Sequence, residues 1–274
     1  MFDRDSLPPL RDVVREHHLS ADKKFGQNFL FDQNLTDKIV RVAGDLSDTT
    51  VIEIGPGPGG LTRSLLVSSA KKVIAIEFDE RAVKALQHLK EAAGERFELI
   101  HADALNLDLR DLCDGKRAII ANLPYNIATP LLIGWLEHIC ENADAYASMA
   151  LMFQKEVALR IAANLGDKEY GRLTVLSQWL CDAKRVFDVP ASAFKPAPKV
   201  TSSIVHLTPK PFNENNPSFQ AVETVTAAAF GQRRKMIRTS LKEYQPYFED
   251  LGIIETKRAE NLRVEDFIAL ANCK

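Results

Sequence analysis

Two short motifs in this chain carry side chains that could do chemistry together. Residues 122–125, Asn-Leu-Pro-Tyr, follow the apolar segment 117–121 and place an amide, a rigid turn and an aromatic ring at the end of an expected strand. Residues 55–60, Gly-Pro-Gly-Pro-Gly-Gly, join another expected strand to an expected helix. Together they predict a site that holds a nucleotide-like cofactor beside a flat base that bears an amino group.

Methylation of such an amine would depend on acceptors more than on a strong base. The N6 amine of adenine is a weak nucleophile because its lone pair is delocalised into the ring, and it must become pyramidal to attack a sulfonium methyl group. We expect the side-chain oxygen of Asn122 and the backbone carbonyl of Leu123 to accept its two N–H groups. Pro124 would stiffen the turn, and Tyr125 would stack on the base, worth ~1–3 kcal/mol. The alternative is an Asn-capped turn with a packed tyrosine.

The glycine-rich turn is ambiguous by itself. Glycines let the backbone turn sharply and approach a ligand that a Cβ would exclude. The run at 55–60 fits both G-x-G-x-x-G and G-x-G-x-G, so it does not separate a dinucleotide from S-adenosylmethionine, or either from a tight turn.

Two acids downstream favour a bound ligand over a plain tight turn. Glu77 ends the next expected strand, where a carboxylate can accept from both hydroxyls of a ribose, and Asp103 follows the third strand, where it can accept from an adenine amine. The carboxyl ends of successive parallel strands meet in one crevice. No second glycine-rich unit follows for the rest of a dinucleotide, so the sequence favours S-adenosylmethionine.

Short apolar runs alternate with helical patterns along most of the chain, which predicts a Rossmann-like α/β fold with a parallel sheet covered on both faces. Strands are expected at 51–55, 72–76, 97–101, 117–121 and 146–153, and helices at 61–67, 80–91, 129–139, 154–163 and 170–180. Two further strands, 184–189 and 200–208, are joined by a short loop and should pair in antiparallel fashion.

The sequence predicts a domain boundary near residue 209. The segment 209–217 contains three prolines and three asparagines, which are typical of a linker. We therefore expect a methyltransferase domain over 1–209 and a small all-α domain over 210–274, with helices at 219–230, 233–243 and 264–272.

Charge is distributed unevenly, although the net charge is only -2. Residues 184–274 contain 14 basic and 10 acidic side chains, whereas residues 1–183 contain 21 and 27. The expected helix at 233–243 carries Arg233, Arg234, Lys235 and Arg238, which suits contacts with RNA phosphates. Lys23 and Lys24 could extend this track. The alternative is a solvated helix whose apolar side chains pack inward.

The remaining bulk properties are those of a soluble protein. Hydrophobic residues make up 46% and charged residues 26% of the chain. Its beginning lacks the pattern of a signal peptide and no apolar run reaches the length of a membrane span, so we expect a cytoplasmic protein. The four cysteines form no C-x-x-C pair, so we expect reduced thiols and no metal site.

Five motifs in fixed order make the chain resemble the small-subunit ribosomal RNA adenine N6,N6-dimethyltransferases. They are 27–30 (Gln-Asn-Phe-Leu), 53–57 (Glu-Ile-Gly-Pro-Gly), 122–126 (Asn-Leu-Pro-Tyr-Asn), 194–200 (Phe-Lys-Pro-Ala-Pro-Lys-Val) and 230–235 (Phe-Gly-Gln-Arg-Arg-Lys).

The resemblance implies a substrate, a partner and a set of cofactor contacts. It implies two methyl transfers to each of two adjacent adenosines in a hairpin loop near the 3′ end of 16S ribosomal RNA. The expected partner is that RNA within the small subunit, and the expected state is a monomer with a role in subunit biogenesis. The implied cofactor contacts are Asn28, Leu30, Gly55, Glu77, Asp103 and Asn122.

Three other functions stay open at the level of sequence. One is an RNA-binding assembly factor whose catalysis is secondary, and another is a nicotinamide oxidoreductase, which leaves residues 122–125 unexplained. A third is a large-subunit antibiotic-resistance methyltransferase with the same site. The runs 230–235 and 258–267 match the small-subunit group better.

Overall fold

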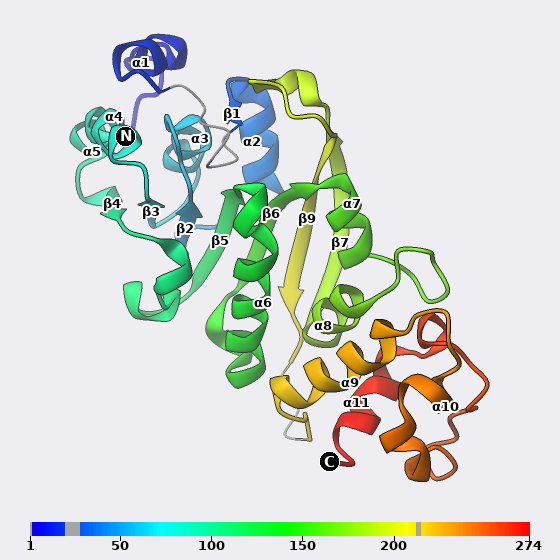
Figure 1. Cartoon of the computed structure of the whole chain (residues 1–274). Coiled ribbons are helices and arrows are strands. Elements are labelled where there is room, and N and C mark those ends of the chain that lie inside the picture. The colour runs from blue at the N-terminus through cyan, green and yellow to red at the C-terminus, as the bar shows by residue number, and fades with distance from the viewer. Residues whose placement is uncertain (1, 20–27, 212–214) are drawn as a thin grey trace.

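The computed structural model describes residues 2–19, 28–211 and 215–274 and has a seven-stranded sheet at its centre (Figure 1). The strand order is β4-β3-β2-β5-β6-β9-β7. Strand β9 alone runs opposite to the other six strands. The strands are β2 (Thr50–Ile54), β3 (Lys72–Glu77), β4 (Phe97–His101), β5 (Arg117–Asn122), β6 (Ser148–Gln154), β7 (Cys181–Val189) and β9 (Ser202–Pro209). The predicted parallel sheet and the predicted antiparallel pair are confirmed.

The strands are nearly continuous apolar runs because helices bury both faces of the sheet. On one face Val51 and Ile120 pack with α2 (Gln33–Val42), α3 (Gly60–Val67) and α5 (Gln87–Ala93). On the other face Ile52 and Ile119 pack with α6 (Tyr125–Glu141), α7 (Lys155–Ile161) and α8 (Arg172–Leu180). Neighbouring residues of one strand therefore enter different cores, as the alternation of side chains along a strand requires.

Two helices differ most from their expected bounds. The helix expected at 80–91 is divided into α4 (Glu80–Ala85) and α5 at Leu86, a fully buried residue that ends the first helix and precedes the second. Helix α6 begins at Tyr125 rather than at 129, because Pro124 occupies its N-cap and the helix continues through Pro130. The early start places Tyr125 on the first turn of a long helix.

A small second sheet was not anticipated. Strand β1 (Phe29–Leu30) pairs in antiparallel fashion with β8 (Phe194–Lys195), so that Leu30 lies opposite Phe194. Helix α1 (Leu10–Glu16) packs beside it, with Val13 and Phe29 in one apolar cluster that α4 completes through Ala82. Segments far apart in the sequence therefore meet at the carboxyl end of the central sheet.

The last 60 residues form a helical segment at the other end of the sheet. Strand β9 runs from Ser202, opposite Gln154, to Pro209, opposite Cys181, and so delivers the chain to the amino ends of the parallel strands. Helices α9 (Phe219–Gly231) and α11 (Val264–Ala271) follow, and Figure 1 shows them beside α8 and away from β1. The rings of Trp179 and Phe219 stack at 6.1 Å, within an apolar cluster that the helical segment shares with the sheet.

The prediction of a continuous basic helix over 233–243 is wrong. Helix α10 covers only Ile237–Ser240, and a 3-10 helix over Lys242–Tyr247 follows it. Met236 forms a β-bridge with Arg258, and the Ile237 and Arg238 amides donate to the carbonyls of Lys257 and Glu255. Because these two amides donate to a distant segment, residues 232–236 do not form the first turn of a helix and adopt a non-helical turn.

No helix within the described ranges is both long enough and apolar enough to cross a membrane.

Candidate functional site

The site lies where the order of the strands reverses. From β2 the chain proceeds to β3 and β4 on one side, and β5 lies on the other side of β2. Open α/β sheets bind ligands at the carboxyl ends of the strands at such a point. A pocket of about 240 Å³ opens here, and every residue predicted to bind the cofactor or the target base lines it: Asn28, Leu30, Gly55, Glu77, Asp103, Asn122, Leu123, Pro124 and Tyr125.

Glycine is favoured at two positions of the turn for different reasons. Gly55 has φ 67°, a left-handed conformation that favours glycine, and a Cβ there would be in ordinary contact with the Pro124 ring at 3.4 Å. A Cβ on Gly60 would lie 2.4 Å from the Leu30 carbonyl oxygen, which is closer than atoms can approach. The turn therefore lies beside both the Asn-Leu-Pro-Tyr motif and β1, and its contact with β1 requires glycine.

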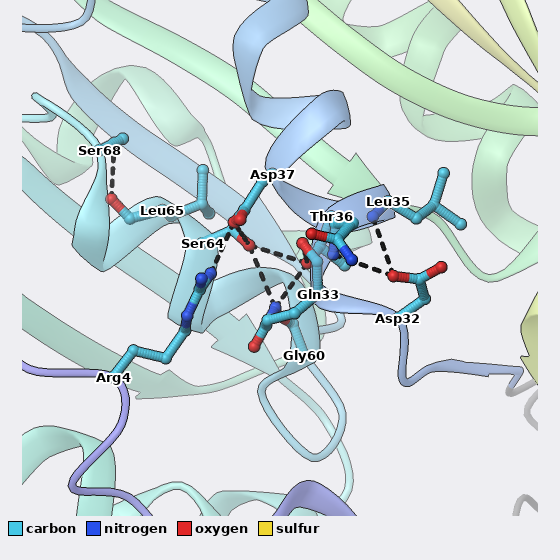
Figure 2. A network of polar contacts seen from close by, with 11 residues as sticks. Arg4, Asp32, Gln33, Leu35, Thr36, Asp37, Gly60, Ser64, Leu65 and Ser68 are labelled. Carbon is cyan, nitrogen blue, oxygen red and sulfur yellow. Dashed lines mark hydrogen bonds and ion pairs between the residues drawn. The ribbon is translucent and has the colours of Figure 1, made fainter.

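A network of polar contacts holds the start of α3 against α2 (Figure 2). The Gln33 Nε2 donates to the Gly60 carbonyl at 2.9 Å, and its other contacts are the hydroxyls of Thr36 and Ser64. Ser64 donates to Asp37 at 2.5 Å, and Arg4 forms an ion pair with the same carboxylate at 2.7 Å. The N-terminal segment and α2 thereby fix the helix that carries the turn.

Glu77 holds the turn as well as facing the pocket. Its Oε2 accepts from the Gly57 amide at 3.0 Å, and its Oε1 accepts from the Phe78 and Asp79 amides at 2.9 and 2.8 Å. Burial raises the pKa of Glu77, and the three amides oppose this by stabilising the carboxylate. A carboxylate offers about four acceptor sites, so capacity remains for a ligand hydroxyl.

Glu53 is a site residue to which sequence reasoning gave no role. It lines the pocket, is only 1% exposed, and its Oε2 has no hydrogen-bond partner among the described residues. Burial raises the pKa of Glu53 to about 8, the nearby Thr62 hydroxyl opposes this rise, and nearby Glu77 adds to it. A buried carboxyl with an unpaired oxygen suits a cationic ligand group. The available signal was an acid inside an otherwise apolar strand.

Two apolar side chains at the pocket were also missed. Phe78 is 59% exposed and Leu105 is 47% exposed, and both line the pocket. Asp103 caps the 3-10 turn Ala104–Asn106, which carries Leu105, since it accepts from the Leu105 amide at 3.0 Å and from the Asn106 side chain at 3.2 Å. Exposed apolar walls beside an acceptor suit the faces and edge of an adenine ring.

Asn122 and Tyr125 are each fixed by one contact. The Asn122 Nδ2 donates to the Asn28 carbonyl at 3.1 Å, which leaves Oδ1 as the acceptor end of the amide. The Tyr125 hydroxyl bonds to the Ser202 hydroxyl at 2.6 Å, and burial raises the pKa of this phenol. A neutral, anchored ring beside an oriented amide suits stacking and acceptance better than proton transfer.

The pocket suits S-adenosylmethionine in its polar groups and in its shape. Glu53 would face the cationic part of that cofactor, and Glu77 would accept from its ribose. Asp103, Phe78 and Leu105 would hold its adenine. No group of three or more His, Cys, Asp or Glu side chains in the described part of the chain is placed to hold a metal ion.

The residues predicted to bind RNA lie away from this pocket. Arg233 donates to the Lys168 carbonyl and lies 3.7 Å from Glu260, and Arg238 lies 3.6 Å from Glu255. Arg234 and Lys235 are exposed and form no ion pair with the described residues. Lys23 and Lys24 lie outside the described residues.

A family model for ribosomal RNA adenine dimethylases matches residues 18–274. The chain belongs to this family.

Similar proteins agree with this assignment over nearly their whole length. A protein from Rhodopseudomonas palustris (strain BisB5) named ribosomal RNA small subunit methyltransferase A is 54% identical, with 98% of this chain and 94% of that protein covered. One of the same name from Rhodospirillum rubrum is 51% identical, with 97% and 92% covered.

Two solved structures share the fold. A dimethyladenosine transferase from Plasmodium falciparum has TM-score 0.72 and 29% identity over 88% of this chain and 95% of that one. The 23S ribosomal RNA methyltransferase ErmE has TM-score 0.66 and 26% identity over 89% and 98%. The Rossmann-like methyltransferase fold and the S-adenosylmethionine cofactor are confirmed, and the nicotinamide oxidoreductase reading is wrong.

Proposed function

We propose that this enzyme transfers methyl groups from S-adenosylmethionine to N6 of two adjacent adenosines in the hairpin loop near the 3′ end of 16S ribosomal RNA. The observation that carries this proposal is the Asn122 amide, held through its nitrogen by Asn28, with its oxygen left to accept from an amine. The small-subunit name of the 51–54% identical relatives supports the choice of RNA.

The side chains of the site act by placing the amine. When bound, the cofactor supplies an electrophilic methyl group on a sulfonium centre. The Asn122 oxygen and the Leu123 carbonyl accept the two N–H groups of N6 and favour its pyramidal form. Tyr125 stacks on the base, and its bond to Ser202 fixes the ring. Placement of this kind lowers a barrier by up to roughly 7–11 kcal/mol in favourable cases.

The product is dimethyladenosine, formed in two steps. In each transfer N6 forms a bond to the methyl carbon as the bond from that carbon to sulfur breaks, and N6 loses one proton to solvent. After the first transfer N6 retains one N–H, which one of the two acceptors still holds while Tyr125 continues to position the ring. Monomethyladenosine therefore appears transiently if the RNA is released between steps.

The protein acts as a cytoplasmic monomer on small ribosomal subunits in this proposal. Arg234 and Lys235, exposed and without ion pairs to the described residues, support RNA contacts remote from the pocket. That separation also favours a second role, in which the protein binds and checks the assembling subunit independently of catalysis.

The proposal is tested by Asn122→Ala on small subunits from a strain that lacks the enzyme. Because the amide oxygen matters most as N6 becomes pyramidal, we expect the single-turnover rate to fall by at least 100-fold and RNA affinity to change far less. Asn142→Ala, at an exposed cap outside the pocket, is the matched control.

Nucleoside mass spectrometry of both ribosomal RNAs identifies the product and its location. Near-normal methylation by Asn122→Ala would refute the role of the amide. Monomethyladenosine as the end product would refute dimethylation, and methylation confined to large-subunit RNA would refute the substrate.

A further inference from the structure

A second hollow adjoins the catalytic pocket. It has a volume of about 310 Å³ and lies between α1 and the end of β8. Phe29 lines both spaces, and it follows Asn28, whose carbonyl holds the catalytic amide of Asn122. The two cavities are therefore separated by no more than the short β1–β8 sheet.

The lining of this hollow combines apolar surface with positive charge. Phe29, Phe31, Val14 and Pro196 provide rings and apolar side chains. Arg11 and Lys195 also line it; both are exposed, and neither forms an ion pair with a described residue. Arg15, the other arginine of α1, pairs with Asp12 and does not line the hollow. Aromatic faces beside free cations are the features that bind a stacked base and its phosphate.

The proposed substrate contains a second nucleotide whose base and phosphate match the lining of this hollow. Two adjacent adenosines are methylated, but the catalytic pocket accepts one base at a time. The neighbouring nucleotide must then lie one backbone repeat from the mouth of that pocket, and the hollow shares the lining residue Phe29 with it. Single-stranded loop bases are free to splay apart in this way.

We propose that this hollow binds the base of the nucleotide next to the target adenosine, with Arg11 and Lys195 contacting the phosphate between them. The inference rests on the proposed function and adds a second subsite to it. The two adenosines exchange places between the pocket and the hollow. Whichever adenosine is not reacting therefore contributes binding energy that positions the other.

The test uses hairpin RNAs with one target adenosine whose neighbour is either purine riboside, which can stack but has no amine to methylate, or an abasic nucleotide. Full-length wild type should bind and methylate the abasic RNA roughly 5- to 150-fold less well, as expected for loss of one base–aromatic stack. Phe31→Leu, which keeps apolar volume but removes the ring, should weaken binding of the purine RNA by a similar factor and of the abasic RNA hardly at all. RNA affinity by fluorescence anisotropy and methylation kcat/KM are both measured.

The charge contacts are tested separately on exposed positions that do not affect folding. Arg11→Ala with Lys195→Ala should lower the affinity for both RNAs and reduce its salt dependence, while Arg15→Ala should not. Affinity for S-adenosylmethionine should stay unchanged in all variants.

Two results would overturn the subsite. One is equal wild-type activity on the two RNAs, and the other is a Phe31→Leu defect of the same size on both. If wild type instead methylates neither hairpin nor small subunits, the proposed function itself fails and the subsite with it.

Discussion

Glu53 and Glu77 are two buried carboxyls at one pocket, and they differ in their partners. Glu77 accepts three backbone amides, whereas one oxygen of Glu53 has no partner among the described residues. Burial raises the pKa of both groups. The protein thus maintains one carboxylate as a structural acceptor and leaves the other to a ligand, and each role can be measured.

Glu77→Gln should weaken the binding of S-adenosylmethionine. The amide nitrogen of glutamine cannot accept from Gly57 or from a ribose hydroxyl, and a hydrogen bond to a charged acceptor contributes ~1.5–3 kcal/mol. Titration calorimetry should show a loss of affinity of at least 10-fold. Glu80→Gln, exposed and paired with Lys84, is the control. An unchanged dissociation constant would contradict the assignment.

Glu53→Gln should stabilise the cofactor-free protein at alkaline pH. The pKa of Glu53 is raised from 4.5 to about 8, so the folded state binds a proton that the unfolded state has released. The contribution of Glu53 to stability is therefore fully present below pH 4.5 and is lost as the pH rises toward 8. Glutamine does not ionise, so the variant does not lose stability in this way. A difference of ~1 kcal/mol in the free energy of unfolding shifts Tm by roughly 2–4 °C in a protein of this size.

Thermal unfolding at pH 5 and pH 9 distinguishes this effect from a stabilisation that does not depend on ionisation. The variant should unfold at a higher temperature than wild type at pH 9 and show a smaller difference at pH 5. Glu91→Gln, on an exposed helix position, should show no pH-dependent difference. A gain of equal size at both pH values would show that ionisation is not the cause.

At the scale of elements, the site depends on contacts between segments that lie far apart in the sequence. The pairing of β1 with β8, more than 160 residues further along, holds Leu30 and the preceding Asn28 at the site. Ser202, at the start of β9, anchors Tyr125 on α6. Helix α2 fixes the turn through Gln33 and Gly60 (Figure 2).

Gln33→Ala should therefore weaken cofactor binding without removing a group that touches the cofactor. The Gly60 carbonyl loses its side-chain donor, a contribution of ~0.5–1.5 kcal/mol, so a loss of several-fold in affinity is expected. KM for S-adenosylmethionine should rise while kcat stays nearly constant. Asn34→Ala, one residue on and exposed, is the control. A fall in kcat with unchanged KM would assign Gln33 a different role.

At the scale of the whole molecule, catalysis and the basic C-terminal surface lie at opposite ends of the sheet. The pocket occupies the carboxyl ends of the strands, and β9 delivers the chain to their amino ends before the helical segment begins. Under the proposed function, contacts of this surface with RNA are therefore separable from the chemistry.

Arg234→Ala with Lys235→Ala should weaken RNA binding and leave S-adenosylmethionine binding intact. If both contact phosphates, the slope of log affinity against log salt should fall by about 1.5. The slope is measured by anisotropy on small-subunit RNA over a range of salt. Lys71→Ala with Lys116→Ala, exposed near the amino ends of β3 and β5, is the matched double control. An unaltered slope would show that Arg234 and Lys235 are only solvated.

The sequence determined the sheet and most of the pocket. Apolar runs alternating with helical periodicity are set by local composition, and parallel strands must align their carboxyl ends. For this reason Gly55, Glu77, Asp103 and Asn122 could be placed in one crevice before any contact was known, and all line it.

Only the tertiary structure decided which groups have partners. The Asn122–Asn28 bond spans 94 residues, and the isolation of Glu53 depends on every element packed around it. The same holds for the turn at 232–236, where charge spacing suggested a helix but the segment 255–258 takes the backbone donors. Periodicity records which faces are buried, whereas long-range hydrogen bonds depend on which segments meet, and that depends on the fold as a whole.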